Sequence, residues 1–81
     1  MYFVYALYNK RHSKIYIGQT SYLEGRIKLH NDSTFKNNYT SRFDGSWKLI
    51  YSEQMRSRND ALRREKELKS HQGRDFVWKI V

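Results

Sequence analysis

The chain contains no cysteine and no proline, and no apolar run approaches the roughly 20 residues needed to span a bilayer. Without cysteine, neither a disulfide framework nor a thiolate zinc site can support the core. The N-terminus lacks the basic region, apolar stretch and small-residue cleavage site of a signal peptide. His12, His30 and His71 are too scattered to predict a metal cluster. We therefore expect a cytoplasmic protein with no membrane partner, folded as a single domain over residues 1–81.

Acidic residues are scarce compared with basic ones. Sixteen Lys and Arg against eight Asp and Glu give a formal net charge of +8. Such an excess favours a polyanionic partner such as nucleic acid, although solubility alone can also account for it. The seven tyrosines and two tryptophans offer stacking surfaces. In a domain this small, however, most aromatic side chains fill the core.

Short β-favouring runs predict a small sheet. Residues Tyr2 to Tyr8 are apolar on both alternating faces, as in a central strand, and Lys14 to Gly18 resume the β pattern after a polar turn. The two runs predict an antiparallel hairpin. Trp47 to Ser52 predict a third strand. Between them, Asp32 to Gly45 form a long polar loop of a kind typical of binding segments or disorder.

Capping signals predict two helices. Ser21 with Glu24 has capping-box spacing and opens a helix to about Asn31, with Leu23 and Ile27 on its inner face. Ser57 with Asp60 repeats the spacing and opens a second helix over 58–69, which Gly73 is expected to terminate. Residues 74–81 are compatible with a helix or a strand. The element order is ββαβαα or ββαβαβ in an α/β (α+β) fold, with a three-stranded sheet flanked by helices.

Glu65 is predicted to lie in the middle of an apolar stripe on the second helix, which is an unexpected position for a carboxylate. At 3.6 residues per turn, Ala61 and Leu68 fall to one side of it and Leu62 to the other, whereas Glu67 projects from the opposite face. An ionised carboxylate that faces a core is costly unless it is paired, hydrogen-bonded or bound to a metal. Glu65 is therefore a candidate metal ligand.

Other candidate residues lie on the first helix and the hairpin. Arg26 and His30, four residues apart, share one helix face and should emerge at the rim of the core. There an arginine can clamp a phosphate and a histidine can move a proton near neutral pH. The alternative is an amphipathic helix whose long basic side chains extend past its apolar edge. Tyr5 and Tyr16 lie on paired strands, where their hydroxyls could converge or simply serve as core aromatics. Together with Glu65, these residues contain the minimum parts of a metal-assisted phosphodiester hydrolase.

Several motifs in order resemble the GIY-YIG nuclease superfamily. Tyr16-Ile17-Gly18 matches the second tripeptide, and Phe3-Val4-Tyr5 takes the place of the first and keeps its tyrosine. The matching positions that follow are Thr20, Leu23, Arg26, His30 and Asn31, the pair Tyr39-Thr40, the strand WKLIYSE, and residues 61–65 (ALRRE). In size the chain is similar to small stand-alone members related to the nuclease domain of the bacterial excinuclease. It departs from the family pattern at Phe3, which replaces a glycine, and in having no asparagine between Asn59 and its end, where larger members carry one.

The resemblance implies an endonuclease that cleaves DNA, selects it by structure rather than by sequence, and has a role such as DNA repair. By similarity, Glu65 binds a single Mg²⁺ or Mn²⁺, Tyr5 activates water, Arg26 binds the scissile phosphate, and Tyr16 and His30 position groups and relay protons. A lone carboxylate suits Mg²⁺, which keeps several waters and takes phosphate oxygens as ligands. Contacts to nucleic acid are expected from Gly18, Lys36, Tyr39, Arg42, Arg63 and Arg64. The catalytic residues should surround one cleft.

Two alternatives stay open at this point. One is a nucleic-acid-binding module of the same fold without useful catalysis, and the other is a protein-interaction domain whose basic face meets acidic partners. The sequence also leaves RNA open as a substrate, along with a protein partner that directs the enzyme to its substrate. It assigns no oligomeric state.

Overall fold

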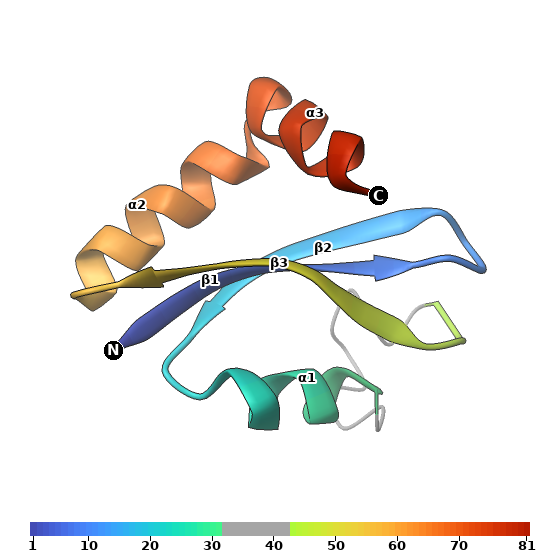
Figure 1. Ribbon diagram of the computed structural model, residues 1–81, viewed down its shortest axis with the longest axis horizontal. Coiled ribbons are helices and arrows are strands. Elements are labelled where there is room, and N and C mark those ends of the chain that lie inside the picture. Colours follow the sequence, from blue (N-terminus) through green and yellow to red (C-terminus); the bar gives the residue numbers. More distant parts are fainter. Residues whose placement is uncertain (32–42) are drawn as a thin grey trace.

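A three-stranded antiparallel sheet, with strand order β2-β1-β3, forms the centre of the fold (Figure 1). The computed structural model describes residues 1–31 and 43–81. Its elements, in order, are β1 (Tyr2–Asn9), β2 (Lys14–Thr20), α1 (Leu23–Asn31), β3 (Trp47–Met55), α2 (Arg58–Lys69) and α3 (His71–Ile80). This confirms the predicted α+β class, with a small sheet flanked by helices. The C-terminal segment, which the sequence left open, is the helix α3.

The hairpin register places the two motif strands side by side. β1 is the central strand, as predicted, and in the β1–β2 pairing Tyr5 lies opposite Gly18 and Leu7 lies opposite Tyr16. On its other side β1 pairs with β3, with a register shift between Ala6 and Leu7. β2 and β3 are therefore the edge strands of the sheet.

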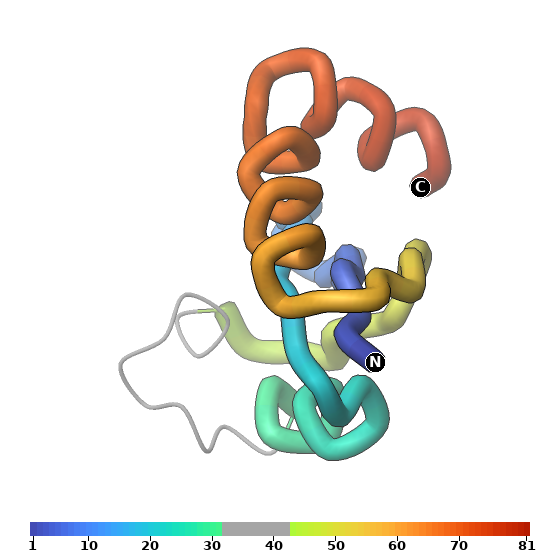
Figure 2. Tube along the Cα trace, turned by 90° about the vertical axis from the view of Figure 1, so that its left-hand side faces the viewer, coloured from blue at the N-terminus to red at the C-terminus, as the bar shows by residue number. Residues whose placement is uncertain are grey.

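The two faces of the sheet are covered by different helices. α1 lies on one face, and α2 and α3 lie on the other, as two views at right angles show (Figures 1 and 2). The core on the α2 side is aliphatic and consists of Val4, Ala6, Ile15, Ile17, Ala61, Leu68 and Val77. The core on the α1 side contains Tyr5, Leu7 and Trp47, against which Tyr16, Leu23 and Ile27 pack. Side chains alternate along β1, so this one strand supplies residues to both cores.

Caps fix the two helices over the aliphatic face. The Ser57 hydroxyl accepts a hydrogen bond from the Asp60 N–H at 3.1 Å, which confirms the predicted start of α2. The sequence suggested that Gly73 terminates α2, and this prediction is wrong. α2 ends at Lys69, and the hydroxyl of the next residue, Ser70, caps α3 by accepting a hydrogen bond from the Gly73 N–H at 3.2 Å. A Cβ built on Gly73 would lie 2.3 Å from the Glu67 carbonyl oxygen, so glycine permits the close approach of the two helices.

Side chains also fix both ends of α1. At the start of α1, the Thr20 hydroxyl accepts a hydrogen bond from the Tyr22 N–H at 3.1 Å. The sequence predicted Ser21 for this role. At its end, the Asn31 side chain makes two hydrogen bonds with the backbone of Trp47. The Asn31 Nδ2 donates to the Trp47 carbonyl oxygen at 3.0 Å, and the Trp47 N–H donates to the Asn31 Oδ1 at 2.7 Å. The end of α1 is thereby clamped to the start of β3.

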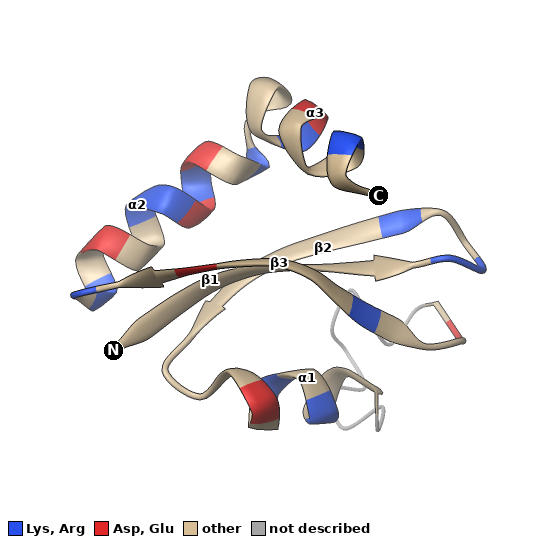
Figure 3. Cartoon of the chain, in the orientation of Figure 1, with Lys and Arg blue, Asp and Glu red and all other residues tan. Residues whose placement is uncertain are grey.

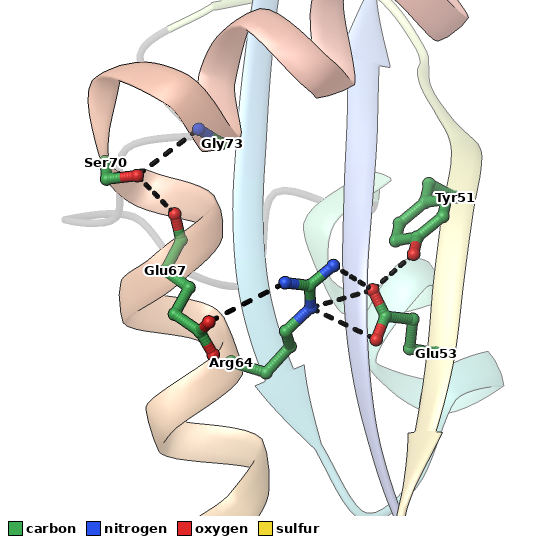
Figure 4. A network of polar contacts seen from close by, with 6 residues as sticks. All are labelled: Tyr51, Glu53, Arg64, Glu67, Ser70 and Gly73. Atoms are coloured by element: carbon green, nitrogen blue, oxygen red, sulfur yellow. Dashed lines mark hydrogen bonds and ion pairs between the residues drawn. The ribbon is translucent and has the colours of Figure 1, made fainter.

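A polar network attaches α2 to the edge strand β3 (Figure 4). The Arg64 guanidinium donates from Nε to both carboxylate oxygens of Glu53, at 3.1 and 2.9 Å, and the Tyr51 hydroxyl donates to the same carboxylate. Burial raises the pKa of the Glu53 carboxyl, but hydrogen bonds from Arg64 and Tyr51 outweigh it and lower the pKa overall. The network fixes the rotation of α2 over the sheet.

None of the helices within residues 1–31 and 43–81 is long and apolar enough to cross a membrane.

Candidate active site

A buried hydrogen bond joins the sheet to α1. The Tyr5 hydroxyl and the His30 Nε2 are 3.0 Å apart, and the two residues are only 1% and 3% exposed. Tyr5 comes from the central strand and His30 from the last turn of α1, so residues 25 positions apart in the chain meet here. The sequence placed His30 at the rim of the core, whereas the structure buries it inside the core.

Tyr16 and Gly18 complete this cluster from β2. The ring centroid of Tyr16 lies 4.7 Å from that of His30 and 6.2 Å from that of Tyr5. A Cβ built on Gly18 would lie 2.8 Å from the Tyr5 hydroxyl oxygen and 2.9 Å from Cε2 of Tyr16. Any larger residue would therefore push into the tyrosines. Gly18 therefore lets the backbone of β2 pass close to the two tyrosines.

Burial keeps the His30 imidazole uncharged at neutral pH. Desolvation, followed by the positive charge of Arg26 one helical turn earlier, lowers the pKa of His30 to about 4. Burial therefore makes His30 a weaker base than an exposed imidazole, and its part in proton transfer stays a prediction. In the tautomer that carries its proton on Nδ1, the ring nitrogen Nε2 can accept the Tyr5 proton.

The Tyr5 phenol is held in its protonated form. Burial raises the pKa of Tyr5 most strongly, the interaction with Tyr16 raises it further, and the Arg26 charge opposes both. The negative charge of Glu65 also contributes to the rise. Tyr5 can therefore act as a base only if its proton moves to a neighbour, and the His30 Nε2 lies within hydrogen-bonding distance of its hydroxyl.

Glu65 approaches the cluster from the other side of the sheet. Its side chain is 19% exposed and pairs with Lys69, whose Nζ lies 2.7 Å from the Glu65 Oε2. Ala61 and Leu68 are buried as predicted, but Leu62 is 44% exposed, so Glu65 lies at the border of the apolar stripe rather than in its middle. The carboxylate is close enough to act on the pKa of Tyr5, although its polar contact is with Lys69.

The two sides of the sheet meet at the free edge of β2. A pocket of about 240 Å³ there is lined by Tyr16 of the tyrosine cluster and by Lys69, the partner of Glu65, together with Ile15, Ile17 and Arg74. Tyr5, Tyr16, Arg26 and His30 thus interact on the α1 side. Glu65 acts on the pKa of Tyr5, and its partner Lys69 lines this pocket beside Tyr16. That all five predicted residues surround one cleft stays a prediction.

The donor chemistry of Glu65 fits a hard divalent cation. Its carboxylate oxygens are partly buried, and Mg²⁺ prefers such oxygens while it keeps several waters of its own. Among the described residues, no group of three or more His, Cys, Asp or Glu side chains forms a metal cage. A metal on Glu65 would therefore depend on water and substrate oxygens for its other ligands, and it would compete with Lys69 for the carboxylate.

The predicted nucleic-acid contacts fall in different places. Lys36, Tyr39 and Arg42 lie outside the described residues. Arg63 is exposed on α2, where basic residues follow the helix (Figure 3). Arg64 is occupied by Glu53, and its Nη1 lies 3.9 Å from Glu67. These contacts stay predictions, with Arg63 better placed than Arg64 to meet a phosphate.

Two partners of the site escaped sequence reasoning. Lys69 lies four residues after Glu65, and this spacing alone could have suggested the ion pair. Glu53, which holds α2 through Arg64, has no such local signal, because the two residues come from different elements. Long-range pairing of this kind depends on how the helix crosses the sheet.

Comparisons with known proteins relate nearly the whole chain to one family. The GIY-YIG catalytic domain family matches residues 1–79. The solution NMR structure of the UPF0213 protein BH0048 from Bacillus halodurans is similar, with a TM-score of 0.56 and 28% sequence identity over 99% of this chain and 85% of that chain. No curated protein matches.

Proposed function

The chain belongs to the GIY-YIG family, which has a nuclease fold, and from this premise we propose that it is an endonuclease that hydrolyses phosphodiester bonds in DNA. The reaction would use one divalent ion, Mg²⁺ or Mn²⁺, bound by Glu65. The observation that carries the proposal is the buried Tyr5–His30 pair, beside Tyr16 and under the charge of Arg26. It combines a proton acceptor, a phenol and a cation in one cluster.

The chain's own residues can activate the attacking water. The Tyr5 oxygen accepts a proton from water as its own proton passes to the His30 Nε2 across their 3.0 Å hydrogen bond. A phosphodiester beside Arg26 would offset the charge that helps to lower the pKa of His30, so substrate makes the imidazole a better acceptor. Proton transfer is thereby coupled to substrate binding.

Positioning is divided between the two sides of the sheet. Arg26 would hold the scissile phosphate by charge-assisted hydrogen bonds, and Tyr16 would orient the phosphate against Tyr5. A metal ion on Glu65 would supply charge stabilisation for the developing negative charge on the phosphate. We propose that nucleic-acid shape rather than sequence is selected, because the described helices and strands include no separate element for reading bases.

Cleavage by the native chain and by Glu65→Gln tests the proposal. The substrates are labelled plasmid, single-stranded and branched DNA, each with Mg²⁺ or Mn²⁺. We expect Glu65→Gln to reduce the cleavage rate by more than about 100-fold. Removing a residue that only hydrogen-bonds to a metal ligand costs up to about 100-fold, and removing the ligand itself should cost more. Glu67→Gln is the matched control, since Glu67 is 58% exposed on the same helix, and should cleave like the native chain. Equal rates for all three proteins would overturn the role of Glu65.

The alternative function is a nucleic-acid-binding module without catalysis. The ion pair between Lys69 and Glu65 favours it, since a lysine already neutralises the proposed metal ligand at 2.7 Å. The same experiment separates the two functions. Binding of DNA by the native chain and Glu65→Gln, with cleavage by neither, would establish the binding module.

A further inference from the structure

The pocket at the free edge of β2 contains a cation that the proposed chemistry does not use. Arg74, in the first half of α3, lines this pocket of about 240 Å³ together with Tyr16 and Lys69. Ligand pockets for drug-sized molecules begin at about 300 Å³, so this one suits a smaller group, such as a single phosphate with part of its sugar. Ile15 and Ile17 form the apolar part of its wall.

The Arg74 guanidinium is held in place without being neutralised. Its Nε donates to the Lys69 carbonyl oxygen at 3.2 Å, at the end of α2. A guanidinium has five N–H donors, so those on its terminal nitrogens are left for another acceptor. No carboxylate within residues 1–31 and 43–81 pairs with it, since Glu65 pairs with Lys69 and Asp75 lies 3.8 Å from His71.

A tethered arginine is well suited to an anion. Because one N–H already fixes the plane of the side chain, less conformational entropy is lost when the remaining donors bind. The isoleucine wall reduces contact with water on one side and so strengthens the attraction to a negative charge. Lys69 is already neutralised by Glu65, which leaves Arg74 as the net positive charge of the pocket.

The position of the pocket beside the tyrosine cluster indicates which anion Arg74 would bind. Tyr16 belongs both to this pocket and to the tyrosine cluster, so an extended nucleic-acid strand with its scissile phosphate at the cluster would run along this edge. We propose that Arg74 binds a neighbouring phosphate of the same strand, in this edge pocket. The inference rests on the proposed function, because it takes the Tyr5–His30 cluster as the place of the scissile phosphate.

Salt-dependent binding tests the proposal. The probe is a fluorescein-labelled single-stranded oligothymidine, and its anisotropy is followed over a range of KCl concentrations in EDTA. Arg74→Gln should weaken binding about tenfold, the effect of losing a hydrogen bond to a charged group. It should also reduce the salt slope by about 0.7, the contribution of one contact on a single strand. Arg58→Gln removes the same charge at the far end of α2 and should keep the native slope.

A measurement on the native chain guards against a folding artefact in the variant. The NMR signal of the Arg74 Nε–H should shift when the oligonucleotide is added, whereas that of Arg58 should not. Arg74→Lys should recover part of the salt slope, because it restores the charge without the planar fork.

The outcomes separate this proposal from the proposed catalysis. If Arg74→Gln keeps the native affinity and slope, and the Arg74 signal does not move, the pocket does not bind phosphate even if the native chain cleaves DNA. If the slope falls as expected but no native cleavage is found, the pocket stands and the nuclease fails. A native chain that binds no oligonucleotide at low salt overturns the phosphate pocket, whereas the nuclease proposal is decided by cleavage of the plasmid and branched DNA.

Discussion

The two faces of the sheet are built from the same strands but from different chemistry. On the α2 side, Val4 and Ala6 of β1 pack into an aliphatic core that includes Leu68 and Val77. On the α1 side, Tyr5 of the same strand meets His30 in a buried hydrogen bond. One face is therefore apolar and stabilising, whereas the other carries titratable groups whose pKa values burial has shifted. A chain of 81 residues thus places its aliphatic core and the buried Tyr5–His30 pair on opposite faces of one sheet, with the proposed metal ligand Glu65 on the α2 side.

The largest expected effect is on the α1 side of the sheet, which carries Tyr5 and His30. Tyr5→Phe should reduce the rate of DNA cleavage by about 10²–10⁴-fold, the usual contribution of a positioned acid or base. Its cost in folding free energy should be about 1 kcal/mol, for one hydrogen bond. Tyr8→Phe is the matched control, because Tyr8 lies on the same strand but packs against the aliphatic core. Cleavage rates and urea unfolding curves of both variants are the measurements. A similar loss of rate in both would remove the distinction between the faces.

The aliphatic face should respond in the opposite way. Leu68→Ala deletes a side chain that is 1% exposed and should lower the free energy of unfolding by about 2–5 kcal/mol. The cleavage rate of the molecules that stay folded should not change. Leu62 lies on the same helix but is 44% exposed. Leu62→Ala should therefore change the free energy of unfolding by no more than about 0.5 kcal/mol. Urea unfolding followed by circular dichroism distinguishes them, and equal losses would contradict the described packing of α2.

The buried histidine gives the α1 side of the sheet its own pH dependence. Because the pKa of His30 is lowered to about 4, the unfolded chain binds a proton near pH 6.5 that the folded chain does not yet bind. Stability should therefore fall as the pH drops from about 6.5 to 4, by no more than about 3 kcal/mol.

His30→Gln should remove this part of the slope, as seen in urea unfolding at a series of pH values. His71→Gln should retain it, because the His71 side chain is 93% exposed. An unchanged slope in His30→Gln would mean that His30 is not the group that titrates.

The smallest effect concerns the polar attachment of α2 to β3. Glu53→Gln weakens the pairing with Arg64, whose side chain is 32% exposed, and should cost about 1 kcal/mol. Glu67, at 3.9 Å from the same guanidinium and 58% exposed, should contribute less than Glu53. Unfolding free energies of Glu53→Gln and Glu67→Gln provide the comparison. Equal losses in the two variants would mean that the Arg64–Glu53 pair, which joins α2 to β3, stabilises the fold no more than the Arg64–Glu67 pair within α2.

Local signals in the sequence predicted most of the fold. The bounds of α2 follow from the Ser57 cap and the pattern of apolar residues within one helix, and the hairpin follows from runs of β-favouring residues. Leu62 was misassigned because burial depends on what a helix covers, and α2 buries Ala61 and Leu68 against the sheet instead. Gly73 was misread as a terminator because a glycine needed for close helix contact looks the same in sequence.

The candidate site could be predicted in its residue types but not in its electrostatics. Motif positions identified Tyr5, Tyr16, Arg26, His30 and Glu65. The described geometry brings the Tyr5, Tyr16 and His30 rings together, and the charges of Arg26 and Glu65 are close enough to act on the pKa of Tyr5. The low pKa of His30 comes from burial by residues distant in the chain, which no local pattern encodes. The pairing of Arg64 with Glu53 likewise depends on how α2 crosses the sheet.

The clamp between Asn31 and Trp47 also bears on how this architecture can be re-engineered. It fixes two backbone points separated by 16 positions, by hydrogen bonds of 3.0 and 2.7 Å, and His30 lies directly beside the first point. Both hydrogen bonds come from the one side chain of Asn31, so the position of His30 against Tyr5 depends on a residue that touches neither of them. A redesign that keeps the Tyr5–His30 pair must therefore also keep Asn31.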